Sequence, residues 1–250
     1  MDLMTSAFLL VLARLSPLFL MTGLTPFSWV PLTVRVVLAS ATALMVSTVS
    51  DHAGMVLDAS QPWLFAFAVL QEVVAGLSLA LAVVIPGAAI GFSARLVDVQ
   101  SGMAAASLLN PATHVDESLM QLVLRWAASV AFFTTGLHVA TLQAFVASFA
   151  IAPAGNAHMV TSVHGFMLLL SSQFLLGLLI AAPVVVGLFA IDIVIGHISR
   201  SMPQANIYFV GLPVKLAATL VLLAVSLRNV PSIVAALYRD AFSAIGHGAT

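Results

Sequence analysis

The stretch GLPVKLAATLVLLAVSL, residues 211–227, has the length and apolar composition of a membrane-spanning helix. Two residues near its start do not suit a helix surrounded by lipid: Pro213 lacks a backbone N–H, and Lys215 carries a charge. A charge in the middle of a bilayer costs at least about 2.5 to 3.5 kcal/mol on insertion scales. The stretch therefore predicts a helix whose first turns contact other protein segments or the membrane surface.

The rest of the chain has the composition of an integral membrane protein. Charged residues make up 7% of the 250 residues, against about 25% in soluble domains, and the mean hydropathy is +1.15. The 66 residues between Arg125 and Asp192 include no Asp, Glu, Lys or Arg, whereas one membrane crossing needs only about 20 apolar residues. A net charge of −1 without a basic cluster argues against a nucleic-acid partner. The absence of cysteine excludes disulfides and thiolate metal sites.

Six apolar stretches predict an all-α membrane protein; they span residues 3–21, 32–49, 63–93, 117–149, 163–199 and 205–227. A continuous helix over the fifth stretch would be roughly 55 Å long, nearly twice the thickness of the hydrocarbon core. Pro183 in that stretch and Pro86 in the third predict bends, and bends expose backbone groups that must be buried against protein or line a watery cavity. We therefore expect about six long, kinked helices and helical hairpins, packed as one subunit of a larger assembly.

Ionisable residues within or at the edges of these stretches are candidate intramembrane polar sites: Arg14, Arg35, Glu72, Arg125, Asp192 and Lys215. Such side chains face protein partners or extend to the headgroups. We expect buried pairing for Glu72 and Lys215, whereas Arg35 and Arg125 suit either arrangement equally well.

Motifs for catalysis are missing from the sequence. It contains no H-E-x-x-H, no G-x-S-x-G, no phosphate-binding loop and no dinucleotide fingerprint, and its seven histidines never occur at i, i+4 spacing. An intramembrane hydrolase assembled from distant residues such as Asp98 and Asp192 has no motif in its favour. The sequence thus predicts no enzyme, no catalytic residues, no metal site and no cofactor.

The segment ARLVDVQSGMAAASLLNPATHVDES, residues 94–118, is a long hydrophobic loop between two apolar stretches. Its Asn-Pro pair at 110–111 favours a turn. From physical chemistry alone it is either a re-entrant linker packed under a helix or a gate that closes a pore by excluding water.

Several motifs resemble the FliR/SctT family, the export-gate subunits of bacterial flagellar and type III secretion systems. They are LARLSPLFLMTG, QEVVAGLSLAL, VQSGMAAASLLNPATH, TTGLHVATLQAF and AAPVVVGLFAIDIVIGHISRSMPQANIYFVGLPVKL, and the resemblance covers nearly the whole chain. The last motif is the most specific, because family members have an Arg, a Pro-Gln-x-Asn turn and a Pro-x-Lys helix start. This sequence matches them with Arg200, Pro203, Gln204, Asn206, Pro213 and Lys215.

The resemblance implies a division of the chain and a site. Residues 1–155 resemble the FliP-type gate subunit and include a plug loop at 99–116, while residues 156–250 resemble the FliQ-type helical hairpin, followed by a C-terminal tail. The implied plug residues are Gly102, Met103, Leu108, Leu109, Asn110 and Pro111. The implied assembly residues are Glu72 and Asp192, together with the six residues of the last motif named above. Family plugs often carry phenylalanine where this chain has Ala105 and Leu108, and Met103, Leu108 and Leu109 can fill the constriction instead.

The implied function is a passive conduit in the bacterial inner membrane, at the flagellar basal body, through which unfolded proteins are exported. The implied partners are FliP-type and FliQ-type gate subunits, FlhB-type and FlhA-type export components, the unfolded substrates and membrane lipid. Two alternatives stay open. One is an injectisome gate subunit of the SctT type, and the other is a stand-alone transporter of small solutes, for which the sequence shows no convincing inverted repeat.

Overall fold

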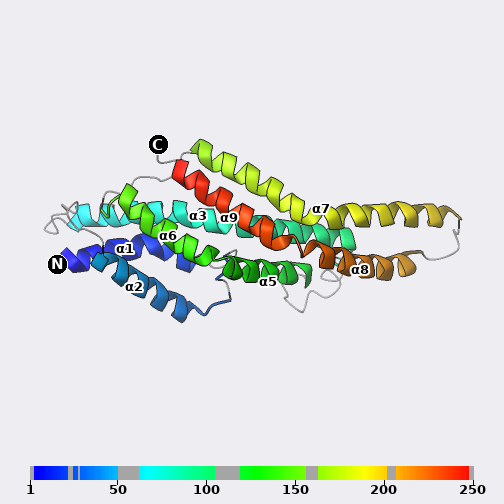
Figure 1. The fold of residues 1–250 in the computed structure, drawn as a ribbon, viewed down its shortest axis with the longest axis horizontal. Helices are drawn as coiled ribbons and strands as arrows, with labels where there is room; N and C mark the ends of the chain where they lie inside the picture. The colour runs from blue at the N-terminus through cyan, green and yellow to red at the C-terminus, as the bar shows by residue number, and fades with distance from the viewer. Residues whose placement is uncertain are drawn as a thin grey trace. The chain divides into compact units, whose positions relative to one another are not determined.

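The computed structural model describes residues 3–21, 25–27, 29–49, 62–104, 119–155, 163–201 and 207–247. Every regular element in these ranges is helical, so the predicted all-α class is confirmed. The helices, labelled in Figure 1, are α1 (Leu3–Leu20), α2 (Leu32–Val49), α3 (Pro62–Ser101), α5 (Leu119–Thr134), α6 (Leu137–Ile151), α7 (Val163–Ser201), α8 (Ile207–Ser226) and α9 (Val230–His247).

Three of the described helices are long and apolar enough to cross a membrane, namely α3, α7 and α8. The α5–α6 pair provides a fourth span if it counts as one broken helix. Helices α1 and α2 are apolar but shorter, so the six predicted stretches correspond to fewer full-length crossings than their number suggests.

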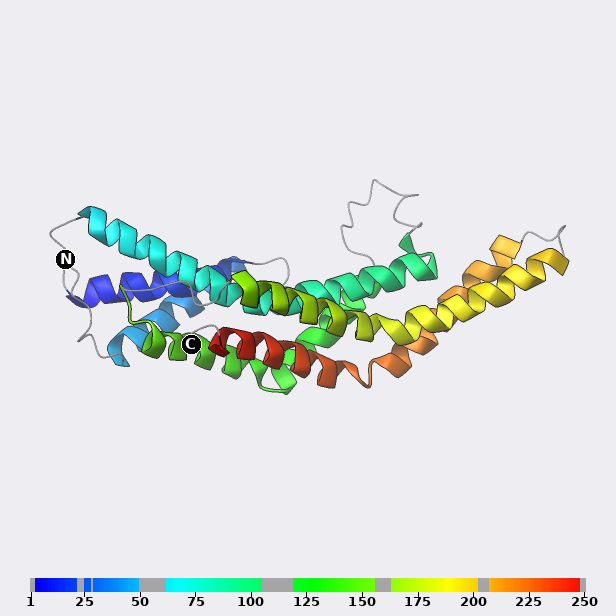
Figure 2. The ribbon, with the colours of Figure 1, turned by 90° about the horizontal axis from the view of Figure 1, so that it is seen from above.

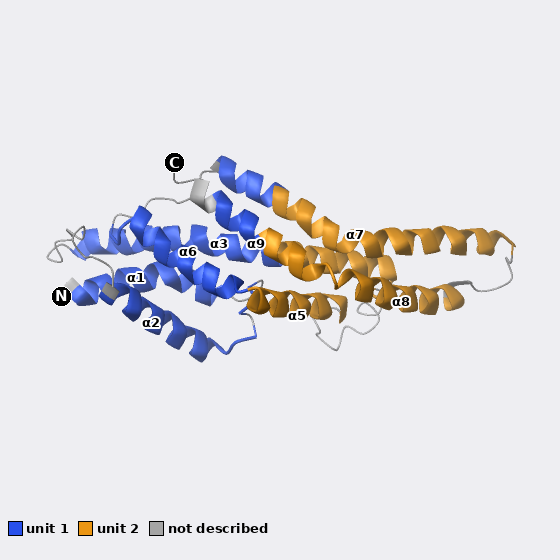
Figure 3. Ribbon diagram, viewed as in Figure 1, with its two compact units in different colours: residues 1–87, 136–171, 238–250 blue, residues 88–135, 172–237 orange. Residues whose placement is uncertain are grey.

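The interruption of the predicted stretch at 117–149 occurs at a glycine. Gly136 has φ of 76°, a left-handed conformation that glycine adopts without a steric penalty, and it separates α5 from α6. The long helices α3 and α7 instead continue as helix past Pro86 and Pro183. The ribbon of α7 changes direction partway along, within unit 2 (Figure 3), which agrees with the bend expected at an internal proline.

The sequence did not predict α9, which lies in the region expected to be a tail. This helix carries Arg239 and Asp240, so a search for continuous apolar stretches passes over it. Its buried residues Val234, Leu237, Tyr238 and Ala241 recur at the spacing of one helical face. It is an amphipathic helix.

The chain divides into two compact units, coloured separately in Figure 3. Unit 1 comprises residues 1–87, 136–171 and 238–250, and unit 2 comprises residues 88–135 and 172–237. The apolar core of unit 1 includes a cluster of Ala82, Ile85, Leu169 and Ala241, flanked by Leu81, Phe166 and Ala244.

Close packing in unit 2 relies on small residues where α3 meets α7. A Cβ atom added at Gly177 would lie 2.9 Å from the carbonyl oxygen of Ala89, and the Ser93 hydroxyl donates a hydrogen bond to the carbonyl of Gly177. Beside this contact the rings of Phe92 and Phe174 lie 4.7 Å apart. Small residues allow such approach between apolar helices.

Helices α7 and α8 lie side by side in unit 2 (Figures 1 and 2) and expose most of their apolar surface. In the most apolar 18-residue segment of each helix, 28% is buried within the chain for α7 and 22% for α8, against 56% for α3. Surface of this kind needs lipid or neighbouring protein around it.

Candidate functional site

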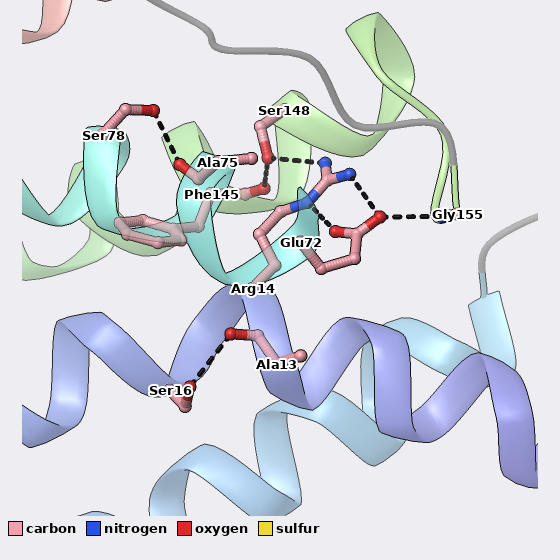
Figure 4. A network of polar contacts seen from close by, with 9 residues as sticks. All are labelled: Ala13, Arg14, Ser16, Glu72, Ala75, Ser78, Phe145, Ser148 and Gly155. Carbon is pink, nitrogen blue, oxygen red and sulfur yellow. Dashed lines mark hydrogen bonds and ion pairs between the residues drawn. The ribbon is translucent and has the colours of Figure 1, made fainter. Parts of the chain in front are cut away.

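A buried ion pair joins α1 to α3 in unit 1 (Figure 4). The side chains of Arg14 and Glu72 are both 0% exposed. The Arg14 Nε donates to Glu72 Oε2 at 2.6 Å, and its Nη2 donates to Glu72 Oε1 at 3.1 Å. This two-point geometry is the strongest arrangement of a guanidinium with a carboxylate.

Further groups from α6 and the turn after it complete the network. The Arg14 Nη1 donates to the Ser148 hydroxyl at 3.3 Å, and the backbone N–H of Gly155 donates to Glu72 Oε1 at 2.7 Å. The guanidinium carbon lies 4.0 Å from the centre of the Phe149 ring, a cation–π contact. The network therefore fixes α1, α3 and the end of α6 to one another.

Gly76 explains how the two charged helices come close enough. It lies one turn after Glu72 on α3, and a Cβ atom at this position would collide with the backbone carbonyl of Arg14. A glycine is therefore required where the two backbones meet.

A second ion pair, in unit 2, joins α7 to α8. Lys215 Nζ is paired with Asp192 Oδ1, and the two side chains are 22% and 33% exposed. Gln100, near the end of α3, donates from Nε2 to Asp192 Oδ2 at 3.0 Å. The structure thus brings together two of the sequence-predicted polar residues, Asp192 and Lys215, and adds Gln100.

The other sequence-predicted residues of the last motif lie apart from this pair or outside the described ranges. Arg200 is exposed in the last turn of α7, where a cation complements the helix dipole. Pro213 lies inside α8 and not at its start, because the helix already begins at Ile207. Pro203, Gln204 and Asn206 fall outside the described residues.

The predicted plug loop is described only at its beginning. Gly102 has φ of 81° and its N–H donates to the Val99 carbonyl at 3.2 Å, so it ends α3 in the left-handed conformation common after helices. Met103 is half-buried, and its N–H donates to the Ser101 hydroxyl at 3.4 Å. The remaining plug residues of the sequence prediction lie outside the described ranges: Leu108, Leu109, Asn110 and Pro111.

Metal-binding clusters were not predicted, and the described residues contain no group of three or more His, Cys, Asp or Glu side chains that could hold a metal ion. The described polar sites consist of ion pairs and hydrogen bonds between helices.

Sequence reasoning missed three members of these networks. Arg14 was noted as a charge in an apolar stretch but not as the partner of Glu72. That its charge is opposite to the charge of Glu72 was the feature that could have indicated the pairing. Ser148 and Gln100 are neutral polar residues in or beside apolar stretches, and nothing in the sequence distinguishes them from the other such residues.

Comparison with known proteins links the chain to bacterial export. The profile of the family described as "Bacterial export proteins, family 1" matches residues 5–241. "Flagellar biosynthetic protein FliR" of Bacillus subtilis (strain 168) is 27% identical over 242 residues, which cover 95% of this chain and 90% of that protein. The protein of the same name from Escherichia coli (strain K12) is 23% identical over 70% of this chain and 67% of its own length. "Yop proteins translocation protein T" of Yersinia pestis is 29% identical over 62% of this chain and 60% of its own length.

Proposed function

Because this chain belongs to the family "Bacterial export proteins, family 1", we propose that it is a flagellar export-gate subunit. In this role it forms part of the channel through which unfolded proteins cross the inner membrane. The observation that carries the proposal is the family match over residues 5–241, nearly the whole chain. It is a membrane protein and a transport component, not an enzyme.

The structure supports this role through its exposed apolar surface. Most of the apolar surface of α7 and α8 is exposed in the chain taken alone, whereas the polar residues Asp192, Lys215 and Gln100 are brought together in unit 2. This distribution suits a subunit whose apolar surface is covered by other membrane helices as well as by lipid.

Flagellar export is favoured over injectisome export by a near full-length alignment with one flagellar protein. The FliR protein of Bacillus subtilis aligns over 95% of this chain, and the Yop translocation protein over 62%. A stand-alone transporter of small solutes has no support in the family match.

The partners and the division of the chain belong to the same proposal. FliP-type and FliQ-type subunits are the neighbours in the gate, with FlhB-type and FlhA-type components beside it, and residues 1–155 and 156–250 correspond to one subunit shape each. In this arrangement the segment at 99–116 is the plug, and Gly102 turns the chain out of α3 into it. The assembly residues are Asp192 and Lys215 with the motif from Arg200 to Pro213, and Glu72 supports them from within the chain, where it is paired with Arg14.

Deletion of the gene and complementation test the function. A strain lacking the gene is expected to be non-motile, to secrete no flagellar filament protein and to regain both on expression of the wild-type chain. Affinity purification of the complementing chain from the membrane is expected to recover other small hydrophobic subunits. A motile deletion strain, or a chain that purifies as a long-lived monomer in mild detergent, would contradict the proposal.

A further inference from the structure

Near the start of α2 lies a buried arginine that has no charged partner among the described residues. Arg35 is 7% exposed, and its Nε donates to the Val30 carbonyl at 2.7 Å. Its Nη1 is buried and has no hydrogen-bond partner among the described residues. A buried charge without a counter-charge is strongly destabilising, so the guanidinium requires an anion that the described part of the chain does not supply.

The start of α2 is a second, independent source of positive potential at the same place. Pro31 precedes the helix and has no side-chain oxygen to cap it, and the first turn contains no acidic residue. The first backbone N–H groups of a helix lack partners within it, and among the bonds between described residues that of Arg35, to the Pro31 carbonyl at 3.2 Å, is the first of this helix. Together with the helix dipole, these free donors make a helix start that favours phosphate.

The described residues before α2 contact the end of α1 and one another. The Phe27 ring lies 6.3 Å from that of Phe19, and the Thr25 hydroxyl donates to the Met21 carbonyl at 3.2 Å. The Val30 N–H donates to the Phe27 carbonyl at 3.0 Å. The guanidinium, bound to Val30, is therefore positioned beside the first turn of α2 before any ligand arrives.

The surroundings of the turn indicate which phosphate compound fits. Trp29, Leu32 and Val34 are 55%, 56% and 45% exposed, and tryptophan is enriched where a membrane protein meets the lipid headgroups. Free phosphate gains nothing from contact with exposed apolar side chains, whereas the acyl chains of a lipid pack against them. We propose that Arg35 and the first turn of α2 bind the phosphate group of an anionic phospholipid, with Trp29 and Leu32 against its apolar part.

Saturation binding tests the site on the full chain, purified in detergent with the subunits that accompany it. The probe is radiolabelled dioctanoyl-phosphatidylglycerol, and the competitors are inorganic phosphate and dioctanoylglycerol, which has the acyl chains without the phosphate. We expect one saturable site per chain and competition by neither compound at equal concentration. Arg35→Gln is expected to weaken binding at least about tenfold and Arg35→Lys to retain most of it. The matched control Arg95→Gln removes an exposed arginine of α3 and is expected to bind like wild type.

The titration of the wild-type chain decides the proposal even where a variant fails to accumulate. Absence of a saturable site in the wild type, or equal binding by the Arg35→Gln and Arg95→Gln variants, overturns it. Competition by inorganic phosphate as strong as by the lipid shows a phosphate site and overturns the lipid as its source. Loss of the accompanying subunits from the Arg35→Gln variant, with no lipid bound to the wild type, identifies the anion as a carboxylate of a partner and also overturns it.

Discussion

The two ion pairs of this chain have the same chemistry and opposite surroundings. Arg14 and Glu72 in unit 1 are fully buried and bonded to Ser148 and Gly155, whereas Asp192 and Lys215 in unit 2 keep a fifth to a third of their side-chain surface exposed. A buried pair is a fixed part of the protein interior, because removal of one partner strands the other charge. A partly exposed pair contributes less to the stability of the chain itself, and its exposed part can contact neighbouring subunits or lipid at the α7–α8 surface.

The largest expected difference between the pairs comes from removing the carboxylate of the buried one. Glu72→Ala leaves the Arg14 charge without a partner and is expected to lower the free energy of unfolding by about 3–5 kcal/mol. Thermal unfolding of the purified complex and the amount of chain in the membrane measure this loss. The double variant Arg14→Met, Glu72→Leu removes both charges and should recover most of the stability; a single variant as stable as wild type would show that the pair is not structural.

The second prediction tests whether the backbone contact beneath the buried pair is as strict as its geometry indicates. Gly76→Ala pushes a methyl group into the Arg14 carbonyl, and overpacking of this kind costs about 1–3 kcal/mol. The control Gly196→Ala lies on α7 with open space around it and should be neutral or slightly stabilising, since alanine favours helix. Equal unfolding temperatures for the two variants would contradict the close approach of α1 and α3.

The sequence predicted the general class of the fold. It also predicted that certain charged residues need partners, but not which residues those partners are. Charges in apolar stretches are conspicuous, so Glu72, Asp192 and Lys215 could be selected without a structure. The pairing of Arg14 with Glu72 spans 58 residues, and with six candidate charges several pairings satisfy the same electrostatic requirement. Only the packing of α1 on α3 around Gly76 selects one of them.

Helix α9 and the break at Gly136 were missed for a different reason. Amphipathic helices contain charges and glycine occurs throughout apolar helices, so neither feature changes the local hydropathy enough to mark a boundary. The buried face of α9 depends on tertiary packing, and the break depends on the left-handed conformation of Gly136.

The third prediction addresses the exposed pair. Lys215→Ala is expected to lower stability by about 1 kcal/mol, because partly exposed ion pairs contribute little and Asp192 keeps its bond from Gln100. Recovery of the assembled complex measures whether neighbouring subunits also depend on the charge. The exchange variant Asp192→Lys, Lys215→Asp should restore recovery if only the pair matters. A loss as large as that of Glu72→Ala would show that the surroundings of α7 and α8 make this pair equivalent to the buried one.

The smallest effect is expected from the neutral third partner of the exposed pair. Gln100→Leu removes the hydrogen bond to Asp192, and single side-chain hydrogen bonds between membrane helices average about 0.6 kcal/mol. Ser148→Ala is the matched change at the buried pair, where Arg14 Nη1 has no other partner among the described residues; leaving a buried donor unsatisfied costs about 1–3 kcal/mol. Thermal unfolding of both variants in the same detergent gives the comparison directly. If Gln100→Leu is the more damaging of the two, the exposed pair depends on its third partner more than the buried one does, and the ranking of the two regions by burial is wrong.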